Sequence, residues 1–161
     1  MSVPEVTARL AVEPDLPALV DLVRHASDAA SVQRGGELWL FEQAPREPLA
    51  DTLAAGLAAD GRHAVLAGCV DGVPVGVMVV DRRALDDGRE VARVSLVFVT
   101  AGARGIGVGE ALLDAATDWA REAGCAGLDG LALPGDRETK NLYERAGMSA
   151  RLITVYRELA P

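Results

Sequence analysis

Residues 99–109 read VTAGARGIGVG, and this glycine-rich run decides how the rest of the sequence is interpreted. It joins residues 91–99, which have the β-branched content of a strand, to an amphipathic segment that begins near Ile106. Its glycines leave backbone N–H groups unshielded where a helix begins, and partial positive charge gathers at that end of a helix. The run therefore predicts a site for an anion such as a phosphate group.

Two well-known phosphate-binding loops fit this run poorly. A Walker loop needs Lys and then Ser or Thr after its second spaced glycine, but Gly107 is followed by Val108 and Gly109. A dinucleotide-binding fingerprint that starts at Gly105 has its third glycine at position 110, where Glu110 stands. The first mismatch excludes a nucleotide triphosphatase, and the second makes a dinucleotide-binding fold a weak hypothesis.

The pattern around the run predicts the order βααβββαβαβ. Strands are expected at residues 5–13, in a hairpin over 64–81 that turns at Asp71-Gly72, and at 91–99, 127–133 and 148–159. Helices are expected after Pro14, near 49–57, from Ile106 to Ala123 and over 136–146. Residues 31–48 are predicted to be irregular. We expect a mixed α/β fold with a twisted, largely antiparallel sheet, helices on both faces, and strands 91–99 and 127–133 parallel across a crossover helix.

The strand over residues 91–99 is expected to have two different faces. With the period of two, Val94, Leu96 and Phe98 share one face. The opposite face changes from polar residues, Arg93 and Ser95, to apolar ones further along. We expect a polar side chain on that second face to point into a cleft.

Length, composition and charge exclude several classes of protein. The chain has 161 residues, 50% hydrophobic and 25% charged, which predicts one domain over residues 1–161. Its net charge of −8 disfavours nucleic acid and suits either plain solubility or a cationic partner such as an amine. The longest run without a charged residue, 94–103, has 10 residues. That is about half of the ~20 needed to cross a bilayer, so we expect a cytoplasmic protein without a membrane partner.

The spacing Arg-x-x-Gly-x-Gly at Arg104, Gly107 and Gly109, five residues beyond the strand, resembles the GNAT superfamily of acyl-CoA-dependent N-acyltransferases. The order of elements and the length match that family along nearly the whole chain, and the specific motifs lie between about residues 91 and 148. The resemblance implies that acetyl-CoA is the cosubstrate, with its pyrophosphate on the backbone of Arg104, Gly105, Ile106, Gly107, Val108 and Gly109 and its pantetheine arm along Val97, Phe98 and Val99. The alternative is a glycine-rich helix start that only turns tightly.

A second stretch, residues 136–148, matches the family through a tyrosine four residues before a turn glycine, Tyr143 and Gly147. Many relatives have an asparagine seven residues before this tyrosine that touches the cofactor, whereas this chain has Asp136 there, so that role is not transferred. Lys140 and Asn141 remain candidate contacts.

Tyr143 is the candidate general acid. When an amine attacks a thioester a thiolate leaves, and a phenol of pKa ~10 can donate a hydrogen bond or a proton to a thiolate whose conjugate acid has a pKa of ~8.5. The alternative is a structural tyrosine whose ring packs under its helix and whose hydroxyl bonds a carbonyl oxygen.

The remaining catalytic groups are less defined. A backbone N–H near Val99 is the candidate donor for the oxyanion. Some relatives have a glutamate on the strand that corresponds to residues 91–99, but this chain has Arg93 and Ser95 there, so the general base is not identified. The candidate bases are Glu37, Asp81, Glu90 and Asp129. If a water chain takes the proton, or if the acceptor amine has a low pKa, none of these carboxylates is needed. The missing carboxylate favours the alternative function, a non-catalytic acyl-CoA-binding module of the same fold.

The acceptor is expected to be an amine of a small molecule or a peptide. A protein N-terminus, an aminoglycoside, a polyamine and a metabolite amine are all compatible with the negative charge of the chain. Trp39 and Phe41 either line its pocket or form a satellite cluster. His25 and His63 are expected to be structural or surface groups. Cys69 and Cys125 have neither metal-ligand spacing nor a basic partner, so we expect neither a metal nor a covalent intermediate. A homodimer is compatible with the resemblance.

Overall fold

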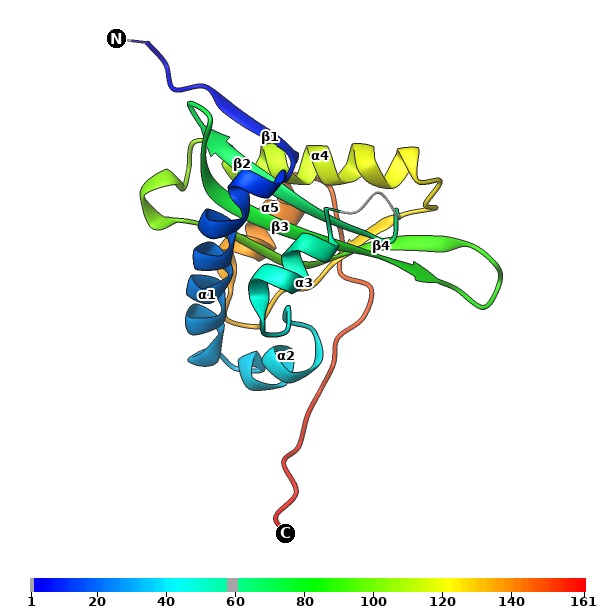
Figure 1. The fold of residues 1–161 in the computed structure, drawn as a ribbon. Helices are drawn as coiled ribbons and strands as arrows, with labels where there is room; N and C mark the ends of the chain where they lie inside the picture. The colour runs from blue at the N-terminus through cyan, green and yellow to red at the C-terminus, as the bar shows by residue number, and fades with distance from the viewer. Residues whose placement is uncertain (1, 58–60) are drawn as a thin grey trace.

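The computed structural model describes residues 2–57 and 61–161 (Figure 1). Its elements follow in the order β1 (Val6–Leu10), η1 (Glu13–Asp15), α1 (Leu16–Ser31), α2 (Gly36–Glu42), α3 (Leu49–Ala55), β2 (His63–Val70), β3 (Val73–Ala84), β4 (Glu90–Val99), η2 (Ala101–Ala103), α4 (Val108–Glu122), β5 (Leu128–Gly130) and α5 (Arg137–Arg145). None of the helices in the described part of the chain is long and apolar enough to cross a membrane.

The strands form one sheet in the order β1-β2-β3-β4-β5. The first four are antiparallel to their neighbours, and β5 runs parallel to β4 after the crossover through α4. Asp71 and Gly72 both adopt positive φ values, 49° and 80°, and make the tight turn between β2 and β3. The predicted mixed sheet, its hairpin and its parallel pair are confirmed.

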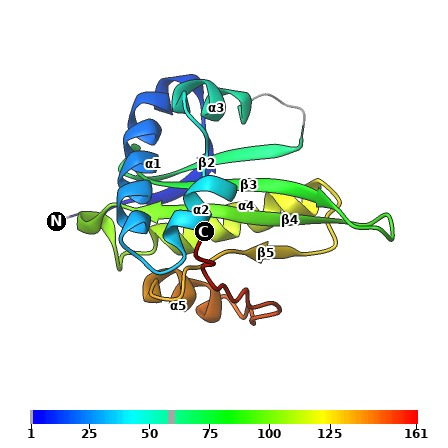
Figure 2. The same cartoon turned by 90° about the horizontal axis from the view of Figure 1, so that it is seen from below.

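Helices cover both faces of this sheet (Figure 2). On one face, α1 and α3 contribute Leu19, Val23 and Leu53 to a core cluster that includes Val77 and Leu96. On the other face, α4 and α5 contribute buried residues to a second cluster: Val108, Leu112, Ala116, Leu142 and Tyr143. Gly68 and Gly76 allow α4 to lie close to the sheet, because a Cβ atom at Gly68 would stand 2.7 Å from the Val108 side chain.

A β-bulge in β4 changes which side chains share a face. Val79 pairs with Leu96 and Val80 pairs with Val94, so Ser95 is the extra residue. Beyond it the alternation is reversed: Val94 packs in the cluster under α4, whereas Leu96 and Phe98 pack on the α1 side. The expectation that Val94, Leu96 and Phe98 lie on one face is therefore wrong for Val94.

Two other sequence expectations need correction. The segment predicted to be irregular, residues 31–48, contains the short helix α2. The strand expected at residues 148–159 is not formed, and this part of the chain has no regular secondary structure. The strand expected at 127–133 is present but shorter, at Leu128–Gly130.

Candidate functional site

The site lies where β4 and β5 stop pairing. Their parallel register ends at Val94 and Gly130, followed by a hydrogen bond of 3.1 Å from the Leu131 N–H to the Val94 carbonyl oxygen. β4 continues to Val99, so its last residues border the opening between the two strands.

The bulge decides which main-chain groups face this opening. The N–H of Thr100 donates to the carbonyl oxygen of Val75 on β3 at 2.9 Å. Along a strand, successive residues direct their N–H and carbonyl groups to opposite sides. Phe98 therefore directs these groups toward β3, as Thr100 does, whereas Val97 and Val99 direct theirs to the open side. Of the residues predicted to bind the pantetheine arm, Val97 and Val99 thus present hydrogen-bonding groups to the opening, and Phe98 does not.

The glycine-rich turn leads directly from this edge to α4. Gly105 and Gly107 have φ values of 77° and 97°, which favour glycine, and a Cβ atom at either would meet nothing within 4 Å. Gly107 is the N-cap of α4, and the first hydrogen bond back to it comes from Ala111 at 2.9 Å. The N–H groups of Val108 and Gly109 therefore have no partner within the helix and lie at its positive end.

Charged side chains surround this helix start. The pKa of Glu110 lies below its ordinary value, first because its carboxylate accepts a hydrogen bond from its own N–H and then because Arg145 donates to it at 2.7 Å. Arg104 donates from Nε to the carbonyl oxygen of Val99 at 2.9 Å, pairs with Glu138 and lies 5.7 Å from the ring centre of Phe98. The turn thus combines main-chain donors with two guanidinium groups.

Tyr143 lies at the opposite side of the opening, on α5. It is 8% exposed, and its hydroxyl donates to the carbonyl oxygen of Leu131 at 3.2 Å. Burial raises the pKa of Tyr143, and the negative charges of Asp136 and Asp129 raise it further. The phenol is therefore a neutral hydrogen-bond donor across the ordinary pH range, and the carbonyl contact is the one expected for a structural tyrosine.

Asp136 has a structural role at the start of α5. Its carboxylate accepts hydrogen bonds from the N–H of Thr139 at 3.0 Å and from the Thr139 hydroxyl at 2.6 Å, which caps the start of α5. Lys140 donates to the carbonyl oxygen of Pro134 at 2.7 Å, and Asn141 is exposed.

Trp39 on α2 contacts the bulge itself. Its indole N–H donates to the carbonyl oxygen of Ser95 at 3.0 Å, and its ring is half-buried against the cluster under α1 and α3. The sequence singled out Trp39 as an aromatic of the acceptor region, but no local pattern predicts a bond across 56 residues. Phe41, on the same helix, is 76% exposed.

Three of the four candidate bases already have a hydrogen-bonded partner. Asp81 pairs with His63 at 2.6 Å, Glu90 pairs with Arg82, and Asp129 accepts hydrogen bonds from Arg93 and Arg83. Burial acts to raise the pKa of Asp129, but the hydrogen bonds and positive charges of the two arginines outweigh it and lower that pKa. A carboxylate held in this way is a weak proton acceptor.

The fourth candidate, Glu37, is exposed in the first turn of α2. His25 is exposed on α1, and its ring centre lies 6.5 Å from that of Phe98, which places this imidazole on the α1 side of the β4 end. Within residues 2–57 and 61–161, no group of three or more His, Cys, Asp or Glu side chains is arranged to hold a metal ion.

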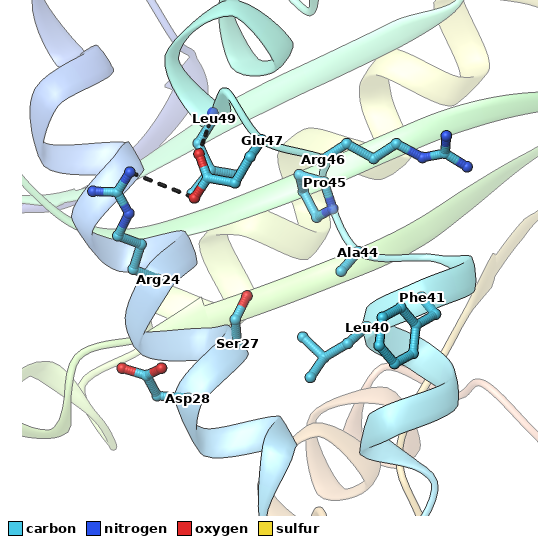
Figure 3. A pocket seen from close by; sticks show the side chains of 10 residues that line it. All are labelled: Arg24, Ser27, Asp28, Leu40, Phe41, Ala44, Pro45, Arg46, Glu47 and Leu49. Carbon is cyan, nitrogen blue, oxygen red and sulfur yellow. Dashed lines mark hydrogen bonds and ion pairs between the residues drawn. The ribbon is translucent and has the colours of Figure 1, made fainter.

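A groove of about 740 Å³ lies between α1, α2 and the loop before α3 (Figure 3). Arg24 and Asp28 line it from α1, Phe41 from α2, and Arg46 and Glu47 from the loop. Arg24 pairs with Glu47 across it at 3.5 Å, and Glu47 also accepts from the N–H of Leu49 at 3.0 Å. Its walls carry charges of both signs beside an aromatic ring, which suits a polar ligand better than an apolar one.

Comparisons with known proteins agree with this architecture. A model of the acetyltransferase (GNAT) family matches residues 23–148. The structure is similar to a ribosomal-protein-alanine N-acetyltransferase from Brucella melitensis biovar Abortus 2308, with 21% identity, a TM-score of 0.71, and coverage of 97% of this chain and 99% of that one. No curated protein matches the chain by sequence.

Two solved structures of one aminoglycoside acetyltransferase, AAC(6')-Iy, are also similar. The first contains a bisubstrate analogue, CoA-S-monomethyl-acetylneamine, and has 19% identity and a TM-score of 0.72 over 97% of this chain and 99% of that one. The second contains CoA and has 17% identity and a TM-score of 0.70 over 99% of this chain and 98% of that one. At these identities the likeness shows a shared fold.

Proposed function

The chain belongs to the acetyltransferase (GNAT) family, and we propose that it transfers an acetyl group from acetyl-CoA to a primary amine by direct attack in a ternary complex. The acceptor in this proposal is a small molecule or a peptide, and residues 1–161 act as one N-acetyltransferase domain. The names of the similar structures support the reaction class, because they describe acetyl transfer to a ribosomal-protein alanine and to an aminoglycoside.

Residues on both sides of the turn suit acetyl-CoA. Val97 offers a main-chain donor and acceptor, and Val99 offers its N–H, along the open side of β4, where an extended amide-containing arm can pair with them; the Val99 carbonyl oxygen already accepts from Arg104. The N–H groups from Gly105 to Gly109 lie at the positive end of α4, which favours a diphosphate, and Arg104 adds a positive charge beside them. The space above Gly105 and Gly107 is open to such a group.

Bound acetyl-CoA supplies a thioester carbonyl that the amine attacks. In the proposal, a main-chain N–H at Val97 or Val99 stabilises negative charge on the carbonyl oxygen, and one such donor is typically worth about 10²–10³ in rate. The carbon–sulfur bond then breaks, and the Tyr143 hydroxyl donates a hydrogen bond or its proton to the departing sulfur. To do so, the hydroxyl gives up its hydrogen bond to the Leu131 carbonyl oxygen, which lies at the opening, and donates to the sulfur in its place.

The amine must lose a proton before or during attack. Because Glu90 and Asp129 are paired with arginines and Asp81 is hydrogen-bonded to His63, we propose that water in the opening takes this proton or that the acceptor is an amine of low pKa. No metal takes part in this reaction.

The observation that carries the proposal is the open main-chain edge of Val97 and Val99 leading directly into the positive-φ turn at the start of α4. The test is release of free thiol from acetyl-CoA on mixing with a panel of amines that includes peptides, polyamines and aminoglycosides. We expect release that depends on both the protein and one class of amine. Binding of acetyl-CoA without amine-stimulated release would contradict catalysis and support the acyl-CoA-binding module instead.

A further inference from the structure

The guanidinium of Arg104 contacts groups on both sides of the opening. Its Nε donates to the carbonyl oxygen of Val99 at 2.9 Å, and its Cζ lies 5.7 Å from the ring centre of Phe98, so β4 holds it from one side. Its Nη1 and Nε also lie 3.3 Å and 3.2 Å from the two carboxylate oxygens of Glu138, in the first turn of α5. Arg104 therefore connects the end of β4 with the helix that carries Tyr143.

Glu138 occupies the donors that a phosphate group would use. A guanidinium presents a planar fork of N–H groups, and this fork binds the oxygens of a carboxylate or of a phosphate in the same way. In the proposed function Arg104 adds its positive charge to the site of the diphosphate. The diphosphate and the Glu138 carboxylate therefore compete for one guanidinium.

The ion pair between Arg104 and Glu138 is of the kind that an anionic ligand can displace. Its side chains are 40% and 65% exposed, and its N–O distances of 3.2 Å and 3.3 Å are longer than the 2.7–2.9 Å usual between charged partners. Exposed pairs of this kind are weak and are screened by salt. The bond to Val99 does not depend on Glu138, so the guanidinium stays beside the turn when the carboxylate leaves it.

The other carboxylates near the start of α4 already have firm partners. Glu110 accepts from Nη2 and Nε of Arg145 at 2.7 Å and 3.2 Å. Asp136 accepts from the N–H and the hydroxyl of Thr139 at 3.0 Å and 2.6 Å, and these two bonds cap α5. The start of α5 is thus secured without Glu138, and a change at Glu138 alters the charge beside Arg104 while the cap of the helix remains.

We propose that Glu138 is a positioning residue that sets the affinity for CoA, because it holds Arg104 before the cosubstrate binds and yields it to the diphosphate on binding. Acetyl-CoA and CoA have the same diphosphate, so this exchange weakens the binding of both, and the CoA product is released more readily after each transfer. The inference rests on the proposed function and adds a competitor for Arg104 to it.

The first test is calorimetric titration of CoA into the full-length wild type and into Glu138→Gln. The amide keeps the size of the side chain but removes its charge, so CoA should bind about threefold to tenfold more tightly to the variant. This gain should shrink in ~1 M salt, where the Debye length is about 3 Å. The control is Glu144→Gln, which removes one charge at an exposed position of the same helix and should bind CoA like the wild type.

The second test asks whether Glu138 acts through Arg104. Residues that share one ion pair are not additive, so the gain from Glu138→Gln should depend on the guanidinium. In an Arg104→Ala background, where CoA binds more weakly, we expect Glu138→Gln to change the affinity by no more than about twofold. Urea unfolding of each variant checks that α5 is intact, because a loss of helix stability alone would not produce tighter binding.

Two results would overturn the inference and leave the proposed function standing. The first is CoA binding by Glu138→Gln that is equal to or weaker than that of the wild type, which would show that Glu138 does not compete with the diphosphate. The second is an equal gain with and without Arg104, which would show that the carboxylate acts by direct repulsion. A wild-type protein that does not bind CoA would overturn the proposed function and this inference together.

Discussion

The ring of Tyr143 lies directly against the backbone of Gly130, so a Cβ atom at Gly130 would stand 2.5 Å from Cζ of the ring. The last paired residue of β5 therefore sets the position of the candidate acid on α5. The contact holds the phenol within reach of the Leu131 carbonyl oxygen at the opening between β4 and β5.

Gly130→Ala should displace the Tyr143 ring, because its methyl group has no room. We expect the free energy of unfolding in urea to fall by about 1–3 kcal/mol, the usual cost of overpacking a core. Gly127→Ala is the matched control, since a Cβ atom there meets nothing within 4 Å. Equal stabilities for the two variants would show that the ring is not held by this contact.

Tyr143→Phe should lower kcat by about 10²–10⁴ if the hydroxyl assists the leaving thiolate, and it should leave the KM for acetyl-CoA nearly unchanged. The measurement is thiol release at saturating acetyl-CoA. Because the pKa of Tyr143 is raised, the wild-type rate should also show no loss assignable to this phenol up to pH ~10, its ordinary pKa. Unchanged turnover in the variant would leave Tyr143 with a structural role alone.

Trp39→Phe should loosen the bulge by removing the donor to the Ser95 carbonyl oxygen while keeping an aromatic ring. An unsatisfied partly buried carbonyl costs about 1–3 kcal/mol, and we expect kcat to fall more than the affinity for CoA. Trp119→Phe, a half-buried tryptophan on α4, is the control. Identical kinetics in the two variants would show that Trp39 has no role in the site.

Asp15 should make the stability of the fold depend on pH. Arg9 donates to its carboxylate at 2.6 Å and 3.0 Å, and this holds the pKa of Asp15 below its ordinary value. The stabilisation is therefore complete above the unfolded-state pKa of ~3.9 and is lost as the pH falls below it.

The measurement for this prediction is urea unfolding of the wild type and Asp15→Asn at several pH values. We expect a difference of about 1.5–3 kcal/mol near pH 7, typical of hydrogen bonds to a charged group, which shrinks below pH ~4. Asp21→Asn, at an exposed position on α1, should show no such trend. A difference that grows on acidification would contradict the direction of the shift.

Local signals in the sequence were sufficient for much of this fold. The Asp71-Gly72 turn requires two positive φ values, and the segment of α4 has the amphipathic period of a helix, so both elements were predicted from a few neighbouring residues. The turn before α4 was predicted for the same reason, because positive φ at Gly105 and Gly107 favours glycine.

The parts that were missed depend on contacts between distant residues. The bulge at Ser95 is held by a bond from its hydroxyl to Val79, 3.4 Å long, and by Trp39 from another helix. The pattern of apolar residues in β4 carries no sign of the extra residue. Residues 148–159 have the apolar composition of a strand, yet a strand also needs a neighbour, and in the structure this segment pairs with no strand of the sheet.

The most direct test of the central claim is calorimetric titration of CoA into Gly107→Ala and into the matched variant Gly72→Ala. Both glycines have positive φ, 97° and 80°, and open space around them, so both substitutions strain the backbone by about 1–2 kcal/mol. We predict that Gly72→Ala binds CoA like the wild type and that Gly107→Ala binds it about tenfold or more weakly. Equal affinities in the two variants, or no heat with the wild type, would contradict a phosphate site at the start of α4.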